Sequence, residues 1–310
     1  MTGPTANRHP SVADRTGPEL AEAHRRAQSG IVAAFLTRFL ALWPLLDPNR
    51  LDETSPGWVS AVMELIGSYR RQSADLATDY YRAAREQDPT GLDPVRIAPE
   101  FTVPDLSVVR TPDRPELPPR IARVFDAVDD TAPRLGRLVA PKIDWSDWDR
   151  AARNSLTVTG PVSQKAKTAR RDPQGRDKSL VESSGAASRH VRAGERETLL
   201  RLVEDDVEAL GWMRVTDGDP CAFCAMLASR GPIYKQGSFD RAQVHDACGC
   251  SLMPVWSTDT GWPGRGKEFE RLWRRSTRGL TGKDAIAAFR RALARQRRDA
   301  DQPAEPGRVA

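Results

Sequence analysis

The sequence of 310 residues has few aromatic residues, only four cysteines and no long apolar run. Its longest nearly continuous apolar stretch, Ile31 to Trp43, has 13 residues and contains Arg38. A bilayer span needs about 20 apolar residues, so we expect no transmembrane helix and no membrane partner. The first thirty residues do not show a basic start followed by an apolar stretch and a small-residue cleavage site. We therefore expect a protein that is made in the cytoplasm and not secreted.

The composition is that of a soluble chain that is folded in part. Hydrophobic residues make up 39% and charged residues 29%, while 24 prolines and 22 glycines indicate long irregular connections. The net charge of +5 is unevenly distributed. From Arg265 onward there are 13 Lys and Arg against 6 Asp and Glu, so the basic character belongs to the C-terminal tail. A tail of this kind favours a nucleic acid or another acidic partner.

Apolar spacing and proline distribution predict the domain organisation. Apolar residues at helical spacing indicate two long helices that form an antiparallel hairpin over 17–87, after a flexible arm at 1–16. Eight prolines mark 88–120 as an extended connection. We expect a helical segment and a basic linker over 121–184, an α+β domain over 185–257 and a basic helical tail over 258–310. The predicted fold class is mainly α with a small α+β domain, in an elongated molecule.

Local signals refine the predicted α+β domain. A helix is predicted over Ser188–Leu210, with Gly211 as its C-terminal cap and His190 on its surface. A strand follows at Trp212–Thr216, and a second, closing strand is predicted at Ser251–Trp256. Between them we expect a short helix over Cys221–Ser229, with Asp219 as its N-cap and Pro220 as its first residue.

All four cysteines lie between positions 221 and 250, together with one histidine, in the pattern C-x2-C-x20-H-x2-C-x-C. Tetrahedral zinc takes Cys and His ligands from two short segments separated by a loop. We therefore expect a structural zinc bound by four of five residues: Cys221, Cys224, His245, Cys248 and Cys250. Two alternatives remain open, which are reduced, buried thiols and a pair of disulfides.

Two catalytic readings of the same residues are weaker. Pro220 to Cys224 matches the P-C-x-x-C half of nucleobase deaminases, but no histidine upstream is followed by the required H-x-E glutamate. A cysteine nucleophile activated by His245 is compatible with the spacing, although the other thiols crowd the same segment. We expect no catalytic residues and no enzymatic activity.

The tail contains two basic helical pieces, Glu268–Thr277 and Lys283–Arg298. Seven arginines on them are candidates for sequence-independent contact with DNA phosphates: Arg274, Arg275, Arg290, Arg291, Arg295, Arg297 and Arg298. An amphipathic helix that docks on a protein partner is an equally good interpretation.

The C-terminal third resembles the MuF-like minor head (minor capsid) proteins of tailed bacteriophages. The resemblance covers roughly residues 185–257 and depends on an ordered set of motifs: Gly211 to Val215, Asp219 to Cys224, Gly231 to Tyr234, His245 to Cys250, and Pro254-Val255. The five Cys and His residues match the family's cysteine and histidine positions.

This resemblance implies a structural protein of the virion, present in few copies in the head interior near the portal and assembled in the host cytoplasm. It also implies portal and capsid proteins as partners, and a role in head morphogenesis and in genome packaging or ejection. Two alternatives remain open. One is a zinc-stapled nucleic-acid-binding protein, and the other is a metal- or thiol-dependent enzyme.

Overall fold

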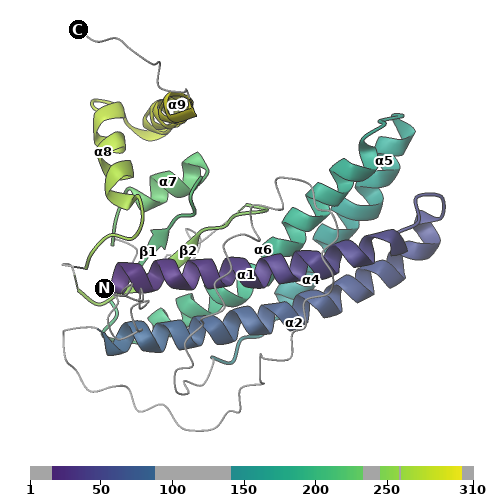
Figure 1. Cartoon of the computed structure of the whole chain (residues 1–310), viewed down its shortest axis with the longest axis horizontal. Helices are drawn as coiled ribbons and strands as arrows, with labels where there is room; N and C mark the ends of the chain where they lie inside the picture. Colours follow the sequence, from purple (N-terminus) through teal and green to yellow (C-terminus); the bar gives the residue numbers. More distant parts are fainter. Residues whose placement is uncertain (1–15, 88–140, 233–244, 258–259, 302–310) are drawn as a thin grey trace, which may run out of the picture.

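The computed structural model describes residues 16–87, 141–232, 245–257 and 260–301. These residues are mainly helical and include one two-stranded antiparallel sheet, which confirms the predicted fold class. The predicted extended connection at 88–120, the part of the helical segment before 141, and nearly all of the predicted arm at 1–16 lie outside the described residues. Figure 1 shows long helices forming a body, with the C-terminal helices at one end.

Two long helices form the N-terminal hairpin (Figure 1). Helix α1 (Gly17–Leu42) begins with a capping box in which the Thr16 N–H donates to the Glu19 carboxylate at 2.9 Å. It continues into the 3-10 turn η2 (Trp43–Leu45), and α2 (Leu51–Glu86) returns alongside it. Aromatic side chains hold the pair together: the Phe39 and Trp58 rings meet edge to face, 6.1 Å apart.

Helix α1 and the turn η2 together form a 29-residue stretch, Gly17–Leu45, that is long and apolar enough to cross a membrane by length and composition alone. The sequence contains no apolar run long enough to suggest this. The core helix of a soluble protein passes the same test. Since Phe35 and Phe39 are fully buried in the helical core, we interpret α1 as a core helix.

The third long helix, α6 (Gly175–Asp205), packs along α2 and also contacts α1. Helices α2 and α6 pack tightly at Gly194, where a Cβ atom would lie 2.1 Å from the Arg70 carbonyl oxygen. Only glycine permits two helix backbones to meet at this distance. The sequence predicted a later helix, beginning at Ser188, and a domain boundary between 184 and 185. That boundary falls inside α6, so one helix belongs to both predicted units.

The segment predicted as a basic linker is helical, and that prediction was wrong. It contains α4 (Ser146–Thr157), a π-helical turn η4 (Val158–Val162) and α5 (Ser163–Ala169), followed by the start of α6. Pro161 lacks the N–H of a regular helix and lies within the π turn, so the chain passes through it without ending the helix. Pro173 lies in the short turn between α5 and α6, and Gly175 is the first residue of α6. The basic side chains of this segment are mostly exposed on the surface of these helices.

The small sheet consists of β1 (Gly211–Val215) and β2 (Ser251–Val255), paired antiparallel with Met213 opposite Met253. Both strands are buried because α1 and α6 pack against β2 while α7 (Ala222–Ala228) and α6 contact β1. Gly211 begins β1 with φ 144° and does not cap a helix, since α6 already ends at Asp205. The sheet therefore shares one apolar core with the N-terminal hairpin.

The predicted basic tail forms α8 (Gly266–Ser276) and α9 (Gly282–Asp301). These two helices pack against each other and against α7, as Figure 1 shows. Phe269 and Phe289 fill the contact and are fully buried. The position of the tail relative to the helical body thus depends mainly on α7.

Candidate metal centre

The first pair of cysteines lies at the start of α7, directly after β1 and a turn. Cys221 is the N-cap residue: the Cys224 backbone N–H donates to the Cys221 Sγ at 3.4 Å. The prediction that Asp219 is the N-cap of this helix was wrong. Asp219 instead forms an ion pair with Arg297 of α9 at 2.8 Å, and Arg297 also donates to the Pro220 carbonyl oxygen. The first cysteine pair is therefore tied to the basic tail.

The second segment, His245 to Cys250, lies just before β2 and is held against α6. The Ala247 N–H donates to the Gly185 carbonyl oxygen at 3.2 Å, and Arg189 forms an ion pair with Asp246 at 2.8 Å. Ala247 has φ 58°, a left-handed conformation that turns the chain sharply. These contacts place His245, Cys248 and Cys250 beside the first cysteine pair.

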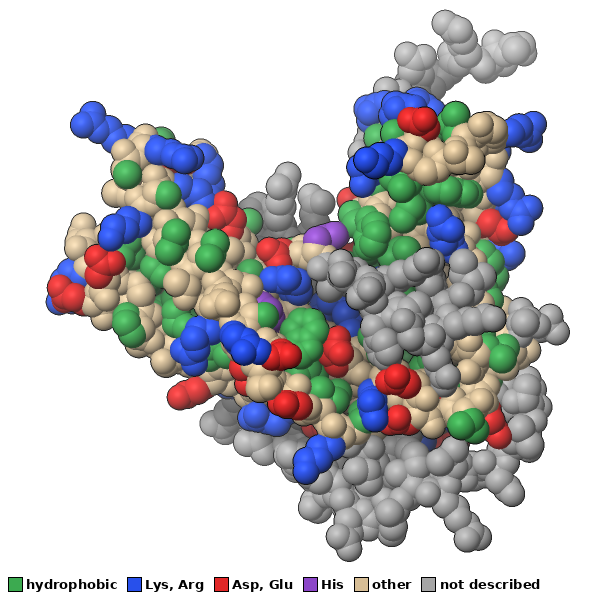
Figure 2. All heavy atoms as spheres, turned by 180° about the vertical axis from the view of Figure 1, so that it is seen from behind, with side chains coloured by type: hydrophobic (Ala, Val, Ile, Leu, Met, Phe, Trp, Pro, Cys, Tyr) green, Lys and Arg blue, Asp and Glu red, His purple; other side chains and the backbone are tan. Residues whose placement is uncertain are grey.

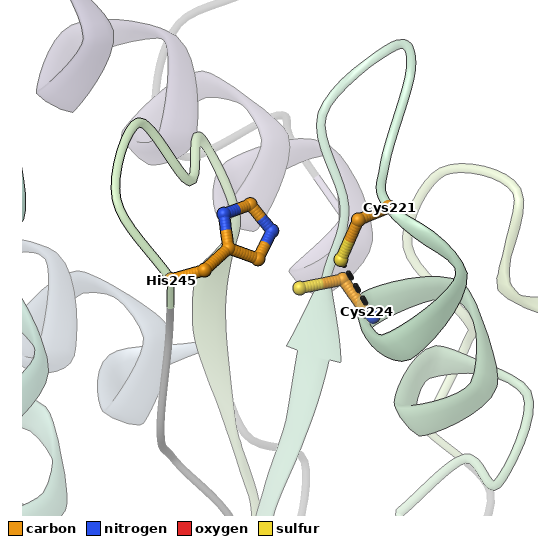
Figure 3. Close-up of side chains that lie close together, drawn as sticks. All are labelled: Cys221, Cys224 and His245. Atoms are coloured by element: carbon orange, nitrogen blue, oxygen red, sulfur yellow. Dashed lines mark hydrogen bonds between the residues drawn. The ribbon is translucent and has the colours of Figure 1, made fainter. Parts of the chain in front are cut away.

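The five predicted donors converge in space and form two overlapping groups. The ligand atoms of Cys221, Cys224 and His245 lie within 4.8 Å of one another, and so do those of Cys224, Cys248 and Cys250. Figure 3 shows the imidazole of His245 on the side toward which the thiols of Cys221 and Cys224 point. Cys224 is common to both groups and is fully buried.

The spacing and chemistry of these donors fit a tetrahedral metal ion. Zinc–sulfur bonds of about 2.3 Å place two thiolates about 3.8 Å apart at the tetrahedral angle. The Cys224 and Cys248 sulfur atoms are 3.6 Å apart. The His245 Nδ1 lies 2.7 Å from the Asp246 carbonyl oxygen, which leaves Nε2 to bind a metal, as in many histidine ligands. The cluster could therefore hold a metal ion.

The thiols differ in acidity because they hydrogen-bond to one another. Hydrogen bonds from the neighbouring thiols Cys224 and Cys250 lower the pKa of Cys248. The pKa of Cys224 is raised by its hydrogen bonds to Cys248 and Cys250. Burial raises the pKa of Cys221, but the Cys224 N–H and His245 outweigh it and lower that pKa overall.

A buried arginine lies beneath the second cysteine pair. Arg196 of α6 is 3% exposed and donates to the carbonyl oxygens of Cys248 and Cys250, at 3.1 and 3.0 Å. Burial lowers its pKa, and the negative charges of Cys248 and Glu195 act against that effect. The sequence analysis missed Arg196. Its spacing along α6 resembles that of any helical arginine, so only the position of the cluster reveals it.

His190 was predicted to lie on the surface, and the structure shows it to be 1% exposed. Its Nε2 lies 3.1 Å from the Ser155 hydroxyl oxygen, because α4 packs over this part of α6. Burial lowers the pKa of His190 to about 3, and the charges of Arg189 and Arg70 act in the same direction. The covering contact comes from a residue 35 positions earlier in the chain, so no signal within α6 indicated that His190 would be buried.

The seven predicted contact arginines lie on α8 and α9, but two of them have partners within the chain. Arg274 pairs with Glu270 at 2.7 Å, and Arg297 binds Asp219. The other five are exposed and form no hydrogen bond or ion pair with the rest of the described chain: Arg275, Arg290, Arg291, Arg295 and Arg298. Figure 2 shows Lys and Arg side chains gathered over the α8–α9 end of the molecule.

Three of these exposed arginines share one face of α9. Arg291, Arg295 and Arg298 are spaced i, i+4 and i+7, so their side chains project in the same direction about one turn apart. Like charges at this spacing destabilise a helix by a few tenths of a kcal/mol per pair. We call this face the α9 arginine face. Its charge is available to bind an anionic partner.

A comparison with protein families matches residues 15–103 and 135–276 to the family described as VG15 protein. The match covers well over half of the chain and includes both cysteine segments. The protein thus belongs to the VG15 family, a family of viral proteins from bacteriophages. Neither the curated proteins nor the solved structures contain a significant match to this chain.

Proposed function

We propose that this protein is a MuF-like minor head (minor capsid) protein of a tailed bacteriophage. It is a structural component of the head interior near the portal, assembled in the host cytoplasm, and it acts in head morphogenesis and in genome packaging or ejection. Membership of a bacteriophage protein family carries this proposal. The ordered motifs from Gly211 to Val255 support it, because they include the paired strands, the start of α7 and both cysteine segments.

The Cys/His cluster has a structural role in this proposal, as a zinc staple. Cys224, Cys248 and Cys250 are almost completely buried, which suits an internal ligand and not a nucleophile that must reach a substrate. The first segment leads into α7, which supports α8 and α9, whereas the second is bound to α6. A zinc ion bound by both would therefore join the C-terminal helices to the helical body. No enzymatic activity is proposed.

The α9 arginine face provides a surface for the proposed partners. Its three exposed guanidinium groups are suited to DNA phosphates inside a filled head or to an acidic surface of the portal or capsid protein. Phe35 and Phe39 of helix α1 lie in the helical core, which supports the expectation of no membrane partner. Portal and capsid proteins are accordingly the proposed partners, with packaged DNA as an additional contact.

The proposal is tested by following the protein through phage assembly. The full chain is tagged and produced with the portal and major capsid proteins, and the assembled particles are separated on a density gradient and quantified by mass spectrometry. We expect the protein to sediment with heads in a few copies and to be captured by the portal protein. Free protein at the top of the gradient, with none in purified virions, would contradict the proposal.

A second function is favoured by the arginine face, namely a zinc-stapled nucleic-acid-binding protein that acts outside the virion. It predicts tight, strongly salt-dependent binding to duplex DNA by the isolated protein, and no association with the portal or capsid protein. The third alternative, a metal- or thiol-dependent enzyme, predicts that a single substitution in the cluster abolishes turnover while the fold survives.

A further inference from the structure

The guanidinium of Arg196 is buried between α6 and the second cysteine segment. One of its terminal nitrogens, Nη2, donates to the carbonyl oxygens of Cys248 and Cys250. Its Nε and Nη1 are buried and have no hydrogen-bond partner within the described part of the chain. A buried cation with unused donors is costly unless an anion lies nearby. A negative charge close to Arg196 would therefore stabilise the buried guanidinium.

Protein carboxylates supply this charge only in part. Glu195 is adjacent in sequence and fully buried, but its carboxylate already accepts a hydrogen bond from Ser251 and lies 3.3 Å from the His24 Nε2. It also lies 3.7 Å from the guanidinium of Arg192, a second buried cation. One carboxylate is thus shared among several cationic or hydrogen-bonding groups. Glu197 also feels the charge of Arg196, but burial raises its pKa and so disfavours its charged form. The thiol cluster lies next to Arg196 as well and can become negatively charged.

We propose that Arg196 provides the buried counter-charge of a thiolate-rich zinc centre and positions its second pair of cysteine ligands. A divalent ion bound to four thiolates has a net charge of −2, and one bound to three thiolates and an imidazole has −1. Either complex is anionic. Four neutral thiols offer no charge, so Arg196 favours the deprotonated, metal-bound form. On binding, each ligating thiol loses one proton to solvent and forms one sulfur–metal bond.

The positioning role follows from the geometry of the two hydrogen bonds. The Cys248 and Cys250 carbonyls flank Gly249, and one guanidinium nitrogen holds both of them against α6. This fixes the turn in which the Cys248 sulfur comes within 3.6 Å of the Cys224 sulfur. A lysine ammonium keeps the charge but lacks the planar fork of the guanidinium. Arg196→Lys and Arg196→Met therefore separate the charge from the geometry.

The experiment measures metal binding by the reduced, metal-stripped full-length protein. Co²⁺ is titrated first, because its sulfur-to-metal charge-transfer absorption reports thiolate ligation directly. Zn²⁺ affinity is then measured by competition with a chromophoric chelator, and Co²⁺ binding is repeated across pH. The variants are R196M and R196K. The control is R201M, which removes an exposed arginine of the same helix that pairs with Glu204 and Asp205.

We expect one metal ion per chain with thiolate absorption in the wild type and in R201M. R196M should lower zinc affinity by about 10- to 100-fold, the usual effect of removing a group that supports the ligands. It should also move the pH midpoint of Co²⁺ binding upward, because protons compete better for thiols that have lost the neighbouring cation. R196K should restore the pH midpoint but not the full affinity. Because a lower affinity from any cause also raises this midpoint, recovery of the midpoint in R196K is the result that separates the charge of Arg196 from a loss of general stability.

Several results would overturn the inference. Equal affinity and an equal pH midpoint in R196M and R201M would remove any special role for Arg196. If R196M does not fold, the positioning role is tested with R196K alone. Wild-type zinc affinity in R196K would contradict that role. Absence of metal binding by the wild type, or recovery of its cysteines as disulfides, would refute the metal centre itself. The inference rests on the zinc staple of the proposed function, whereas incorporation into virions is measured separately and can succeed when the metal centre fails.

Discussion

The contact between α2 and α6 at Gly194 allows a sharp test of the fold. An alanine Cβ at position 194 would lie 2.1 Å from the Arg70 carbonyl oxygen and 3.1 Å from the Ala74 nitrogen. Ordinary contact begins near 3.4 Å, so the two helices would have to separate by about 1.3 Å at this point. Backbone atoms cannot rotate away as a side chain can. The separation would also loosen the packing of neighbouring core residues such as Val191 and Ile66.

The magnitude follows from two opposing effects. Overpacking a well-packed core costs roughly 1–3 kcal/mol, and a clash with backbone should lie at or above the top of that range. The higher helix propensity of alanine returns at most about 1 kcal/mol. We therefore expect G194A to lower the free energy of unfolding by about 2 kcal/mol or more. For a protein of this size, about 2 kcal/mol corresponds to a fall in Tm of roughly 3 °C.

Gly57 is the matched control, because it lies within α2 and a Cβ there would meet nothing within 4 Å. The same substitution, G57A, should stabilise the protein by about 0.5–1 kcal/mol through helix propensity and reduced freedom of the unfolded chain. Thermal and urea unfolding, followed by circular dichroism, measure both variants under the same conditions. A G194A protein that unfolds at or above the wild-type temperature would refute the close helix contact described above.

Three further predictions concern the cluster, the buried histidine and the arginine face. Because Cys224 belongs to both donor groups, C224S should abolish tight zinc binding and lower the Tm of the metal-loaded protein, and an unchanged melt would argue against a structural site. The pKa of His190 is about 6.5 in the unfolded chain and about 3 in the folded protein. Between pH 8 and pH 5 only the unfolded state gains the proton, so the free energy of unfolding should fall by about 2 kcal/mol. H190Q should remove that part of the acid sensitivity in urea titrations, whereas an identical pH profile would contradict the buried, neutral imidazole. Replacing Arg291, Arg295 and Arg298 with Gln should weaken binding to duplex DNA and reduce its salt slope by up to about 3. Equal slopes for the wild type and this variant would exclude DNA contact by the α9 arginine face.

Much of the local structure could be predicted from the sequence. The two N-terminal helices, the tail helices and the strands on either side of the cysteine segments lie where periodicity and turn residues indicate them. Errors arose at 150–178, where proline, glycine and a run of basic residues indicated a linker. Helix α6 begins at Gly175, and the chain accommodates Pro161 in the π turn η4. Both are possible because these helices are buried on one face against their neighbours. Such burial cannot be seen in a local window of sequence.

The candidate metal site likewise has a part that the sequence indicates and a part that depends on long-range packing. Clustering of four cysteines and His245 within 30 residues was enough to indicate the five donors, because metal-ligand spacing is a short-range property of the chain. The supporting residues come from far away in the sequence. Arg196 and Gly185 precede the second segment by about 50 residues or more, and Arg297 of α9 reaches back to Asp219.

Local sequence was enough to indicate most of the long helices and both strands, the positions of the thiol and imidazole donors, and the concentration of positive charge in the tail. These properties depend on the order of neighbouring residues and on their apolar period. Long-range packing sets the remaining features: α6 underlies the cluster, His190 and Arg196 are buried, and five of the seven tail arginines are exposed and without a partner in the described chain. Those features depend on which apolar helix faces pack together. The amphipathic pattern of a helix shows that one face will be buried, but it does not specify the element against which that face packs.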